Sequence, residues 1–496
     1  MMDSLPDLII KVIFDLLPTN DVNAICFALS CKRALPRVPY DDQLHYSKDN
    51  TVLTFGHTFN QTLAPPSIPD TVEQINLSFD FNLPIGQGEL PPSLTMLKLS
   101  GKFNQPLAPG VLPESLTSLH MTSDQPYHHV LGERVLPPSL TNLTLGRISS
   151  SIPPGVLPAS LRSLVFTSGY EQPIAIGVLP PSLTHLCLGN LFNHALDPDV
   201  LPTSLRYLNL GDGYTCHIRP GVLPSKSLHS LTLGGGFPTP FEPGALPSSI
   251  TSLVFNSQFN EPFTRGVLPS SLTLLYLNTI RNRDIALDVF PETLTQLIFG
   301  GGFDLPITPG LLPNTLLDLN LGQYFSRRLV PGGLPSSLTR LILGRSYDLL
   351  IPPGALPDSI TDIALGYGYE VSFPSNIKKI IRSMRGIDLS WVDKINRPSL
   401  ESVRISATTH WTSGKMIGTV SKLKELCIHF INMKQTVANQ REERQLIDSV
   451  LGMSPNVTTI QLETGYNPIN LRTIDNRSYL CLNLLLLILL LSDKII

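Results

Sequence analysis

Few residues of this chain have the types and spacing that catalysis or metal binding requires. Gly234-Gly235-Gly236 and Gly300-Gly301-Gly302 could suggest phosphate-binding loops, but neither is followed by Gly-Lys-Ser/Thr or by G-x-G-x-x-G. His128-His129 has no cysteine or carboxylate beside it at metal-ligand spacing. Serines recur in a Pro-x-Ser-Leu motif, and the sequence holds no Gly-x-Ser-x-Gly elbow. We therefore expect no catalytic residue, no metal, no cofactor and a protein that is not an enzyme.

Composition narrows the class of partner. The 496 residues include 36 basic and 39 acidic side chains, a net charge of −3, and basic and aromatic residues do not interleave into a stripe that would bind nucleic acid. Apolar residues make up 42% of the chain, so it has enough material for a core and is not disordered. Glycine and proline number 35 and 45, which indicates many turns. A turn-rich, apolar chain with few charges points to a repeat.

Cysteine use and the chain ends predict a soluble protein of the cytoplasm. The six cysteines follow no disulfide framework, and the N-terminal residues lack the basic and apolar regions of a signal peptide. The apolar run from Leu480 to Leu491 is shorter than the ~20 residues of a membrane-spanning helix. A docked helix or a poorly ordered end is favoured there over a tail anchor, and no membrane partner is expected.

A 22-residue period dominates the sequence. The signature Leu-Pro-x-Ser-Leu-x-x-Leu-x-Leu and its variants begin at Ile68, Leu90, Leu112, Leu136, Leu157, Leu179, Leu201, Leu223, Leu246, Leu268, Phe290, Leu312, Leu334 and Leu356. Ten of the thirteen intervals between these copies are 22 residues long. Such regularity predicts a solenoid in which each coil buries its core only against its neighbours.

Each unit is expected to form one short strand and an extended return segment. In one copy, Leu119 and Met121 point inward and His120 outward, as alternation along a strand requires. Pro109-Gly110 and Pro113 exclude a useful helix from the return segment. We therefore expect successive strands to stack in parallel. An aromatic ladder is predicted from Phe59, Phe81, Phe103, Phe192, Phe237, Phe259, Phe303 and Phe325.

The outward positions of the strands are the remaining candidates for function, because solenoids bind partners through such stacked faces. The mixed outward positions include Met96, Lys98, Gln296, Asn320 and Asp362. The candidate partner-binding residues are His120, His185, Tyr207, Asn209, Tyr276, Asp318 and Arg340. The alternative is a merely solvated face, since exposed polar residues are ordinary.

The repeat resembles the FNIP family of leucine-rich-repeat-like units. The residues that carry the resemblance are Phe59-Asn60, Phe81-Asn82-Leu83-Pro84-Ile85, Phe103-Asn104-Gln105-Pro106-Leu107, Phe192-Asn193 and Phe259-Asn260-Glu261-Pro262-Phe263. The units after Met121 and after Leu277 lack the Phe-Asn pair, so these coils are expected to bulge or to carry a local site. Beyond Leu365 the period loosens, with strand-like pieces at Ile377, Leu400, Leu423 and Val457.

The first residues follow a different, helical pattern. Leu8, Ile9, Val12, Ile13 and Leu16 recur at helical spacing. The stretch Leu5-Pro6-x-x-Ile9-Ile10-x-x-Ile13-Phe14-x-Leu16-Leu17-Pro18-x-x-Asp21-Val22, followed by Cys31-Lys32-Arg33, resembles an F-box, although Leu8 replaces the usual acidic residue and Ala34 a common aromatic one. The resemblance implies binding of a Skp-type adaptor through Leu5, Pro6, Ile9, Ile10, Ile13, Leu17 and Pro18.

These observations predict a leucine-rich-repeat-like solenoid with a parallel β-strand ladder, extended return segments and a small N-terminal α-helical F-box. The expected parts are an F-box-like module at 1–35, a linker at 36–54, about fourteen FNIP repeats at 55–372, divergent coils that cap the end at 373–475 and an apolar tail at 476–496.

The two resemblances together imply the substrate-recognition subunit of an SCF-type (Skp-adaptor, cullin–RING) E3 ubiquitin ligase with an unidentified protein target. F-boxes and FNIP repeats occur together in giant-virus proteins, which would make the chain a viral factor in the host cytoplasm that redirects host ubiquitination. The alternative is a repeat scaffold without a ligase link, whose first helices only cap the solenoid.

Overall fold

A computed structural model shows the arrangement of the repeat. It describes residues 45–47, 49, 51–63, 68–123, 125–234, 241–256, 262–278, 285–344, 346–366, 376–384, 400–407, 425–430, 459–464 and 467–472. The chain divides into two compact units, unit 1 (Met1–Ile250) and unit 2 (Thr251–Ile496). The F-box-like module and the apolar tail expected from the sequence lie outside the described residues.

Unit 1 is built on a ladder of short strands. They are β1 (His45–Tyr46), β2 (Val52–Thr54), β3 (Gln74–Asn76), β4 (Met96–Gly101), β5 (Ser118–Ser123), β6 (Asn142–Leu145), β7 (Ser163–Phe166), β8 (His185–Cys187), β9 (Tyr207–Asn209) and β10 (Ser230–Leu233). From β2 to β10 each strand pairs in parallel with the next. At the start, β1 pairs antiparallel with β2, so the first edge of the ladder is covered by a hairpin.

Unit 2 continues the same design. Its strands are β11 (Ser252–Phe255), β12 (Leu274–Leu277), β13 (Gln296–Phe299), β14 (Asp318–Asn320), β15 (Arg340–Ile342), β16 (Asp362–Leu365), β17 (Lys379–Met384), β18 (Ser402–Ala407), β19 (Glu425–Phe430), β20 (Thr459–Thr464) and β21 (Asn467–Arg472). The strands β11 to β20 pair in parallel, and β21 closes the last edge by pairing antiparallel with β20.

The solenoid follows the sequence period. Each of the fourteen signature copies is followed by one strand, from β3 to β16, which gives a parallel β-solenoid of about fourteen turns. The strands β17 to β20 begin two residues after Ile377, Leu400, Leu423 and Val457, where the looser pattern predicts them. The segment 36–54, expected to be a linker, contains β1 and β2, so the ladder begins before residue 55.

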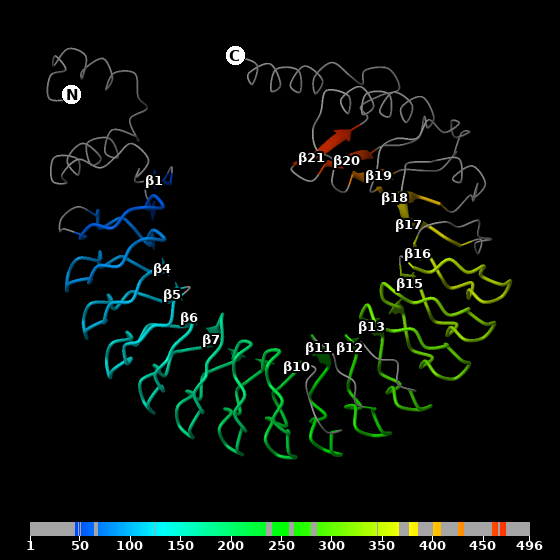
Figure 1. Cartoon of the computed structure of the whole chain (residues 1–496), viewed down its shortest axis with the longest axis horizontal. Coiled ribbons are helices and arrows are strands. Elements are labelled where there is room, and N and C mark those ends of the chain that lie inside the picture. The colour runs from blue at the N-terminus through cyan, green and yellow to red at the C-terminus, as the bar shows by residue number, and fades with distance from the viewer. Residues whose placement is uncertain are drawn as a thin grey trace, which may run out of the picture. The chain divides into compact units, whose positions relative to one another are not determined.

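Alternation along each strand separates the core from the surface. In β9, Leu208 is fully buried while Tyr207 and Asn209 on either side are half-buried. Burial of one leucine stabilises the fold by roughly 1.5–3 kcal/mol, and every coil contributes several such side chains. In Figure 1 the strands of each unit line the inner side of its arc, and the return segments loop outward.

The return segments add the predicted aromatic ladder. The rings of Phe59, Phe81 and Phe103 are stacked, with centroids 6.3 and 6.1 Å apart. Phe303 and Phe325 stack in the same way at 6.0 Å. Buried tyrosines that the sequence analysis did not include occupy further rungs: Tyr127, Tyr170, Tyr214 and Tyr347. Phe237 and Phe259 lie outside the described residues.

The repeated serines and threonines join each coil to the one before it. The hydroxyl of Ser204 donates to the carbonyl of Leu183 at 2.6 Å, and that of Ser337 donates to Leu316 at the same distance. Thr117 donates in the same way to Thr95 at 3.1 Å. A hydrogen bond of this kind contributes about 1 kcal/mol net. The serines of the signature are therefore structural, in agreement with their interpretation from sequence.

Glycine follows the strand where neighbouring coils come closest. Gly211 has φ of +78°, and a Cβ atom there would lie 1.9 Å from the carbonyl oxygen of Gly189. Gly322 repeats this geometry in unit 2, with φ of +79° and Gly300 oxygen at 2.0 Å. Glycine is needed here because it alone tolerates both the left-handed conformation and the close backbone approach.

Candidate functional site

The outward side chains of the parallel strands form a surface that we call the strand face. Each short strand presents a first outward position and, two residues later, a second one, as Tyr207 and Asn209 do in β9. The residue before the strand, Arg206 in this coil, is exposed as well. Because the pairing register is continuous, equivalent positions form columns that run from coil to coil about 4.8 Å apart.

Three predicted partner-binding residues of unit 1 lie together on this face. The rings of His185 and Tyr207 occupy the first outward position of adjacent strands and stack with centroids 6.0 Å apart. Asn209 follows on β9, and its side-chain oxygen accepts a hydrogen bond from the Gly211 amide at 2.8 Å. His185 and Tyr207 therefore present an aromatic pair, while Asn209 also holds the turn after its strand.

His120 is separate from this group, because β5 lies three strands away from β8 in the ladder. Its ring nitrogen Nε2 lies 3.1 Å from the hydroxyl of Ser118 on the same strand. Burial lowers the pKa of His120, and the neighbouring charge of Lys98 lowers it further. His120 is therefore held toward its neutral form, as a hydrogen-bonding rather than a charged group.

In unit 2 the predicted residues form an ion pair and an isolated aromatic. Arg340 Nη1 lies 3.1 Å from Asp318 Oδ2 across adjacent strands. Burial raises the pKa of Asp318, the Arg340 guanidinium opposes that rise, and the charge of Asp362 adds to it. Tyr276 lies on β12, paired with Val254 and Ile298 and two strands from Asp318.

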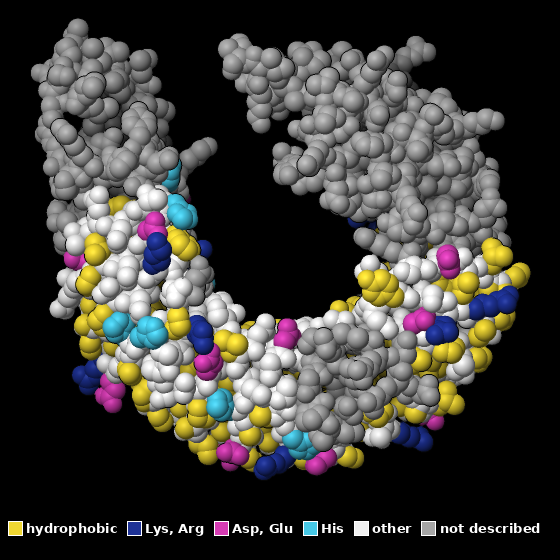
Figure 2. Space-filling model, viewed as in Figure 1, with side chains coloured by type: hydrophobic (Ala, Val, Ile, Leu, Met, Phe, Trp, Pro, Cys, Tyr) yellow, Lys and Arg dark blue, Asp and Glu magenta, His cyan; other side chains and the backbone are white. Residues whose placement is uncertain are grey.

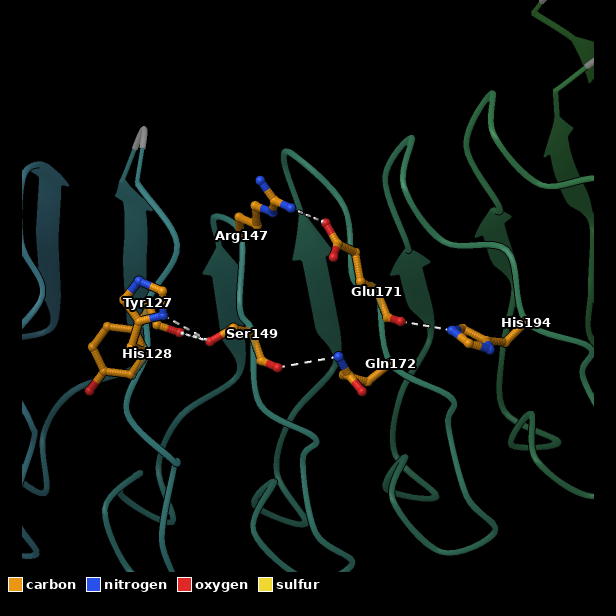
Figure 3. Close-up of polar contacts among 7 residues, drawn as sticks. All are labelled: Tyr127, His128, Arg147, Ser149, Glu171, Gln172 and His194. Atoms are coloured by element: carbon orange, nitrogen blue, oxygen red, sulfur yellow. Dashed lines mark hydrogen bonds and ion pairs between the residues drawn. The ribbon is translucent and has the colours of Figure 1, made fainter.

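A second row of polar contacts runs over the turns that follow the strands of unit 1 (Figure 3). Arg147 forms an ion pair of 2.6 Å with Glu171, whose carbonyl contacts His194 Nε2 at 2.7 Å. The side chain of Gln172 donates to the Ser149 carbonyl at 3.2 Å, and His128 Nδ1 lies 3.2 Å from the Ser149 hydroxyl. All of these contacts join neighbouring coils, so this row stabilises the stack.

The irregular unit after Met121 belongs to this row. Tyr127 and His128 take the places of the missing Phe-Asn pair: Tyr127 is buried, and the His128 amide donates to Asn104 Oδ1 at 3.1 Å. A cavity of about 10 Å³, the size of one water molecule, remains beneath the unit between Phe103 and Tyr127. This coil therefore places a buried tyrosine where other units have phenylalanine, and the next coil places Ile148 between Tyr127 and Tyr170.

A family model now accounts for the repeat. The FNIP Repeat model matches residues 81–124, 149–191, 192–236, 237–279, 282–324 and 325–368, together more than half of the chain. The chain belongs to the FNIP repeat family. The matched segments each span about two coils of the solenoid.

Solved structures place this FNIP solenoid among leucine-rich-repeat folds. The crystal structure of CroV588, described as a novel circular leucine-rich-repeat protein, is 28% identical with a TM-score of 0.59, over 83% of this chain and 68% of that one. The TLR13–ssRNA13 complex matches with a TM-score of 0.53 at 15% identity, over 87% of this chain and 69% of TLR13, which shows the fold alone. No curated protein matches the chain in sequence.

Two features of the strand face were missed from the sequence. In unit 2 the second outward position is apolar in most coils: Val254, Tyr276, Ile298, Ile342, Ala364 and Ile381. In unit 1, Arg162 and Arg206 precede β7 and β9 and are exposed. Both could have been found by aligning the FNIP units and reading each outward column separately, rather than selecting polar residues one by one.

Other kinds of site have little support in the described part of the chain. Within it, no three His, Cys, Asp or Glu side chains are grouped as metal ligands would be. None of the described residues belongs to a helix with the length and hydropathy that crossing a bilayer requires. The FNIP solenoid matches no enzyme family, and leucine-rich-repeat-like folds typically serve as scaffolds for protein interaction.

Proposed function

We propose that this FNIP solenoid is the substrate-recognition subunit of an SCF-type E3 ubiquitin ligase. Residues 1–35 would bind a Skp-type adaptor, the strand face would hold a protein target, and the cullin–RING machinery would transfer ubiquitin. The observation that carries the proposal is the Leu5-Pro6 to Cys31-Lys32-Arg33 pattern directly before a protein-binding type of solenoid.

The edge of the ladder supports this role for the first residues. In the alternative, residues 1–35 are needed only to cover the first coil. The strand edge of that coil is already paired, because β1 pairs with β2 and the Ser47 amide donates to the Val52 carbonyl at 3.0 Å. Residues 1–35 are therefore not needed to pair this strand edge, which supports a role for them in binding an adaptor.

The charge distribution favours a protein target over nucleic acid. On the visible face of the described residues, acidic and basic side chains are interspersed (Figure 2). The net charge of −3 gives no overall attraction to phosphate backbones. Stacked aromatic, charged and aliphatic groups on the strand face are the kinds of side chain that protein interfaces use.

Adaptor binding tests the proposal. Full-length chain, Ile13→Asp and Lys11→Asp are each mixed with a purified Skp-type adaptor and co-precipitated. A charge at Ile13 should abolish binding because it replaces an apolar side chain of the predicted docking surface, whereas Lys11 lies outside the apolar pattern and its variant should bind as the unmodified chain does. Equal binding by the unmodified chain and Ile13→Asp, or no binding by either, would reject the ligase assignment.

Deletion of the first residues distinguishes the ligase proposal from the alternative in which they only cap the solenoid. Removal of residues 1–34 should leave the melting temperature of the solenoid nearly unchanged if β1 is the cover of the first coil. If those residues only cap the solenoid, their removal exposes the apolar side of the first coils and lowers the melting temperature. Thermal unfolding followed by circular dichroism distinguishes the two.

A further inference from the structure

We propose that the strand face over β7 to β10 binds a short extended peptide with two anionic side chains about 10 Å apart. The residues that would recognise it are Arg162, His185, Arg206 and Tyr207, which we call the basic face. The proposal rests on the part of the proposed function that assigns target binding to the strand face, and it is independent of adaptor binding.

The two arginines occupy one column of the ladder. The amide of Thr184 donates to the Arg162 carbonyl at 2.8 Å, and the amide of Arg206 donates to the Thr184 carbonyl at 2.8 Å. Arg162 and Arg206 are thus two coils apart, a separation of about 10 Å from the strand spacing. Both are exposed, and neither guanidinium has a hydrogen bond or ion pair among the described residues.

Three other described arginines are already engaged in ion pairs. Arg147 pairs with Glu171, Arg327 with Asp304, and Arg340 with Asp318. A guanidinium with no carboxylate beside it keeps its five donors for an external anion and binds a carboxylate or phosphate in a bidentate manner. Arg162 and Arg206 are therefore the arginines of unit 1 whose position on the strand face suits ligand binding.

An aromatic pair lies beside the two arginines. Tyr207 and His185 stack at 6.0 Å with an angle of 28° between their rings. The Thr184 hydroxyl donates its proton to the Arg162 carbonyl at 3.0 Å, so its contact of 2.9 Å with His185 Nδ1 requires that nitrogen to donate. The ring is held by this chain of hydrogen bonds, which prepares a fixed surface for an apolar side chain of the peptide.

No acidic side chain opposes the arginines on this part of the face. The outward strand positions from β6 to β10, and the residues just before these strands, contain no aspartate or glutamate. A cluster of one sign attracts ligands of the opposite sign and speeds their association. The corresponding face of unit 2 differs, because Asp318 and Asp362 lie in register with Arg340 on either side.

The spacing specifies the ligand. In the polyproline II conformation the chain advances about 3.1 Å per residue with three residues per turn, so side chains three residues apart lie on the same side and span about 9 Å. A peptide with acidic residues at positions i and i+3 and an apolar residue between them would reach both guanidinium groups and the aromatic pair. Glutamate carboxylates and phosphoserine phosphates share the required anionic oxygens, and the experiment compares them.

Fluorescence anisotropy with the full chain tests the proposal. The probes are labelled peptides with Glu-Leu-Leu-Glu, Gln-Leu-Leu-Gln or pSer-Leu-Leu-pSer at their centre, and a single-stranded oligonucleotide. We expect the Glu or phosphoserine peptide to bind at least tenfold more tightly than the Gln peptide, with affinity that falls as salt rises. If only the phosphoserine peptide binds, the site recognises phosphorylated partners. If the glutamate peptide binds, the site recognises partners with acidic side chains.

Variants locate the site. Arg162→Gln and Arg206→Gln should each weaken binding about tenfold, and the double variant should remove the difference between acidic and Gln peptides. Arg219→Gln, at an exposed arginine in the return segment between β9 and β10 of unit 1, is the matched control and should bind as the unmodified chain does. Because the side chains of Arg162 and Arg206 are exposed and their guanidinium groups make no hydrogen bond or ion pair among the described residues, their variants should melt as the unmodified chain does.

The outcomes separate this proposal from the ligase assignment. No preference for acidic over Gln peptides, or unchanged binding by the double variant, would overturn the basic face, even where the Skp-type adaptor co-precipitates. Tighter binding of the oligonucleotide than of either acidic peptide would also overturn it and assign the arginines to nucleic acid. Acidic peptide binding without adaptor binding would keep the basic face and reject the ligase assignment.

Discussion

The two units share a core and differ on the strand face. Their inward positions hold the same buried leucine, isoleucine and phenylalanine side chains. The second outward positions of unit 1 are mostly polar: Thr54, Asn76, Lys98, His120, Thr144, Val165, Cys187, Asn209 and Thr232. Those of unit 2 are mostly apolar up to β17, with Asn320 as the exception.

This difference shows which positions the solenoid itself requires. A coil is stabilised by the side chains it buries against its neighbours and by the hydrogen bonds between coils, and both are the same in the two units. The outward columns are not needed for folding, so they can differ in polarity. A half-exposed apolar column of the kind found in unit 2 is typical of surfaces that bind other proteins.

The largest expected effect tests whether the cores are equivalent. Phe325→Ala in unit 2 and Phe192→Ala in unit 1 each remove a fully buried ring that stacks on its neighbours, Phe325 at 5.7 Å from Tyr347 and Phe192 at 5.9 Å from Tyr214. Each should lower the free energy of unfolding by about 3–5 kcal/mol because a cavity remains. Urea unfolding measures the free energy of unfolding of both variants. A decrease for only one of them would contradict equivalent cores in the two units.

The next effect concerns the turn glycines. Gly211→Ala and Gly322→Ala should each cost about 2–3 kcal/mol, because a left-handed residue gains a Cβ atom that meets the backbone of the previous coil. Gly221→Ala and Gly310→Ala are matched controls with φ of +88° and +81° but open space around the added atom. They should cost about 1 kcal/mol. Equal losses in all four variants would show that backbone strain alone matters.

A smaller effect is expected when the outward columns are exchanged. Ile298→Thr with Ile342→Thr in unit 2, and Thr144→Ile in unit 1, should each change the free energy of unfolding by less than about 1 kcal/mol because the sites are half-exposed. Thermal unfolding checks this. Loss of more than about 2 kcal/mol would mean that the apolar column belongs to the core, and the comparison of the two faces would fail.

The smallest effect is a difference in pH dependence. Burial and Lys98 lower the pKa of His120 below its ordinary value of 6.5, so the folded state disfavours the charged imidazole. Stability is then lost as pH falls below 6.5, and His120→Asn should reduce this loss. The urea concentration at the unfolding midpoint, measured at pH 8 and at pH 5.5, gives this loss of stability. For the unmodified protein and for His120→Asn, the value at pH 8 is the reference.

Asp318 in unit 2 should behave in the opposite sense. Burial raises the pKa of Asp318 above its ordinary value of 3.8, so the folded state disfavours the carboxylate. Stability is then lost as the pH rises above 3.8 and the carboxyl group ionises. Asp318→Asn should therefore flatten the dependence between pH 3.5 and pH 6. If the pH dependence of stability is unchanged in His120→Asn or in Asp318→Asn, the substituted group does not contribute to it.

Periodicity was enough to predict the ladder but not the composition of its rungs. Leu119 and Met121 were expected inward from the strand pattern, and both are buried. The aromatic ladder was predicted from the phenylalanines, yet Tyr170 and Tyr347 also belong to it because their hydroxyls accept hydrogen bonds from the amides of Ile152 and Leu329. Sequence could not show that a tyrosine would find a polar partner inside the stack.

The candidate site was predicted only in part, for a similar reason. His185 and Tyr207 were selected individually as outward residues, and the structure stacks them. Asn209 was selected for its polarity, but its side-chain oxygen is used by the Gly211 amide. The contrast between the outward columns was in the sequence, but it needed the pairing register to assign each residue to a column.

By itself, the sequence determined the repeat length, the strand positions and the inward core, because a solenoid only requires each unit to match its neighbours. The tertiary structure decided which outward residues share a surface. It placed Arg162 and Arg206 in one column, paired Arg340 with Asp318, and used β1 and β21 to cover the exposed edges. The physical reason is that residues a full period apart become neighbours at about 4.8 Å only when the coils stack in register.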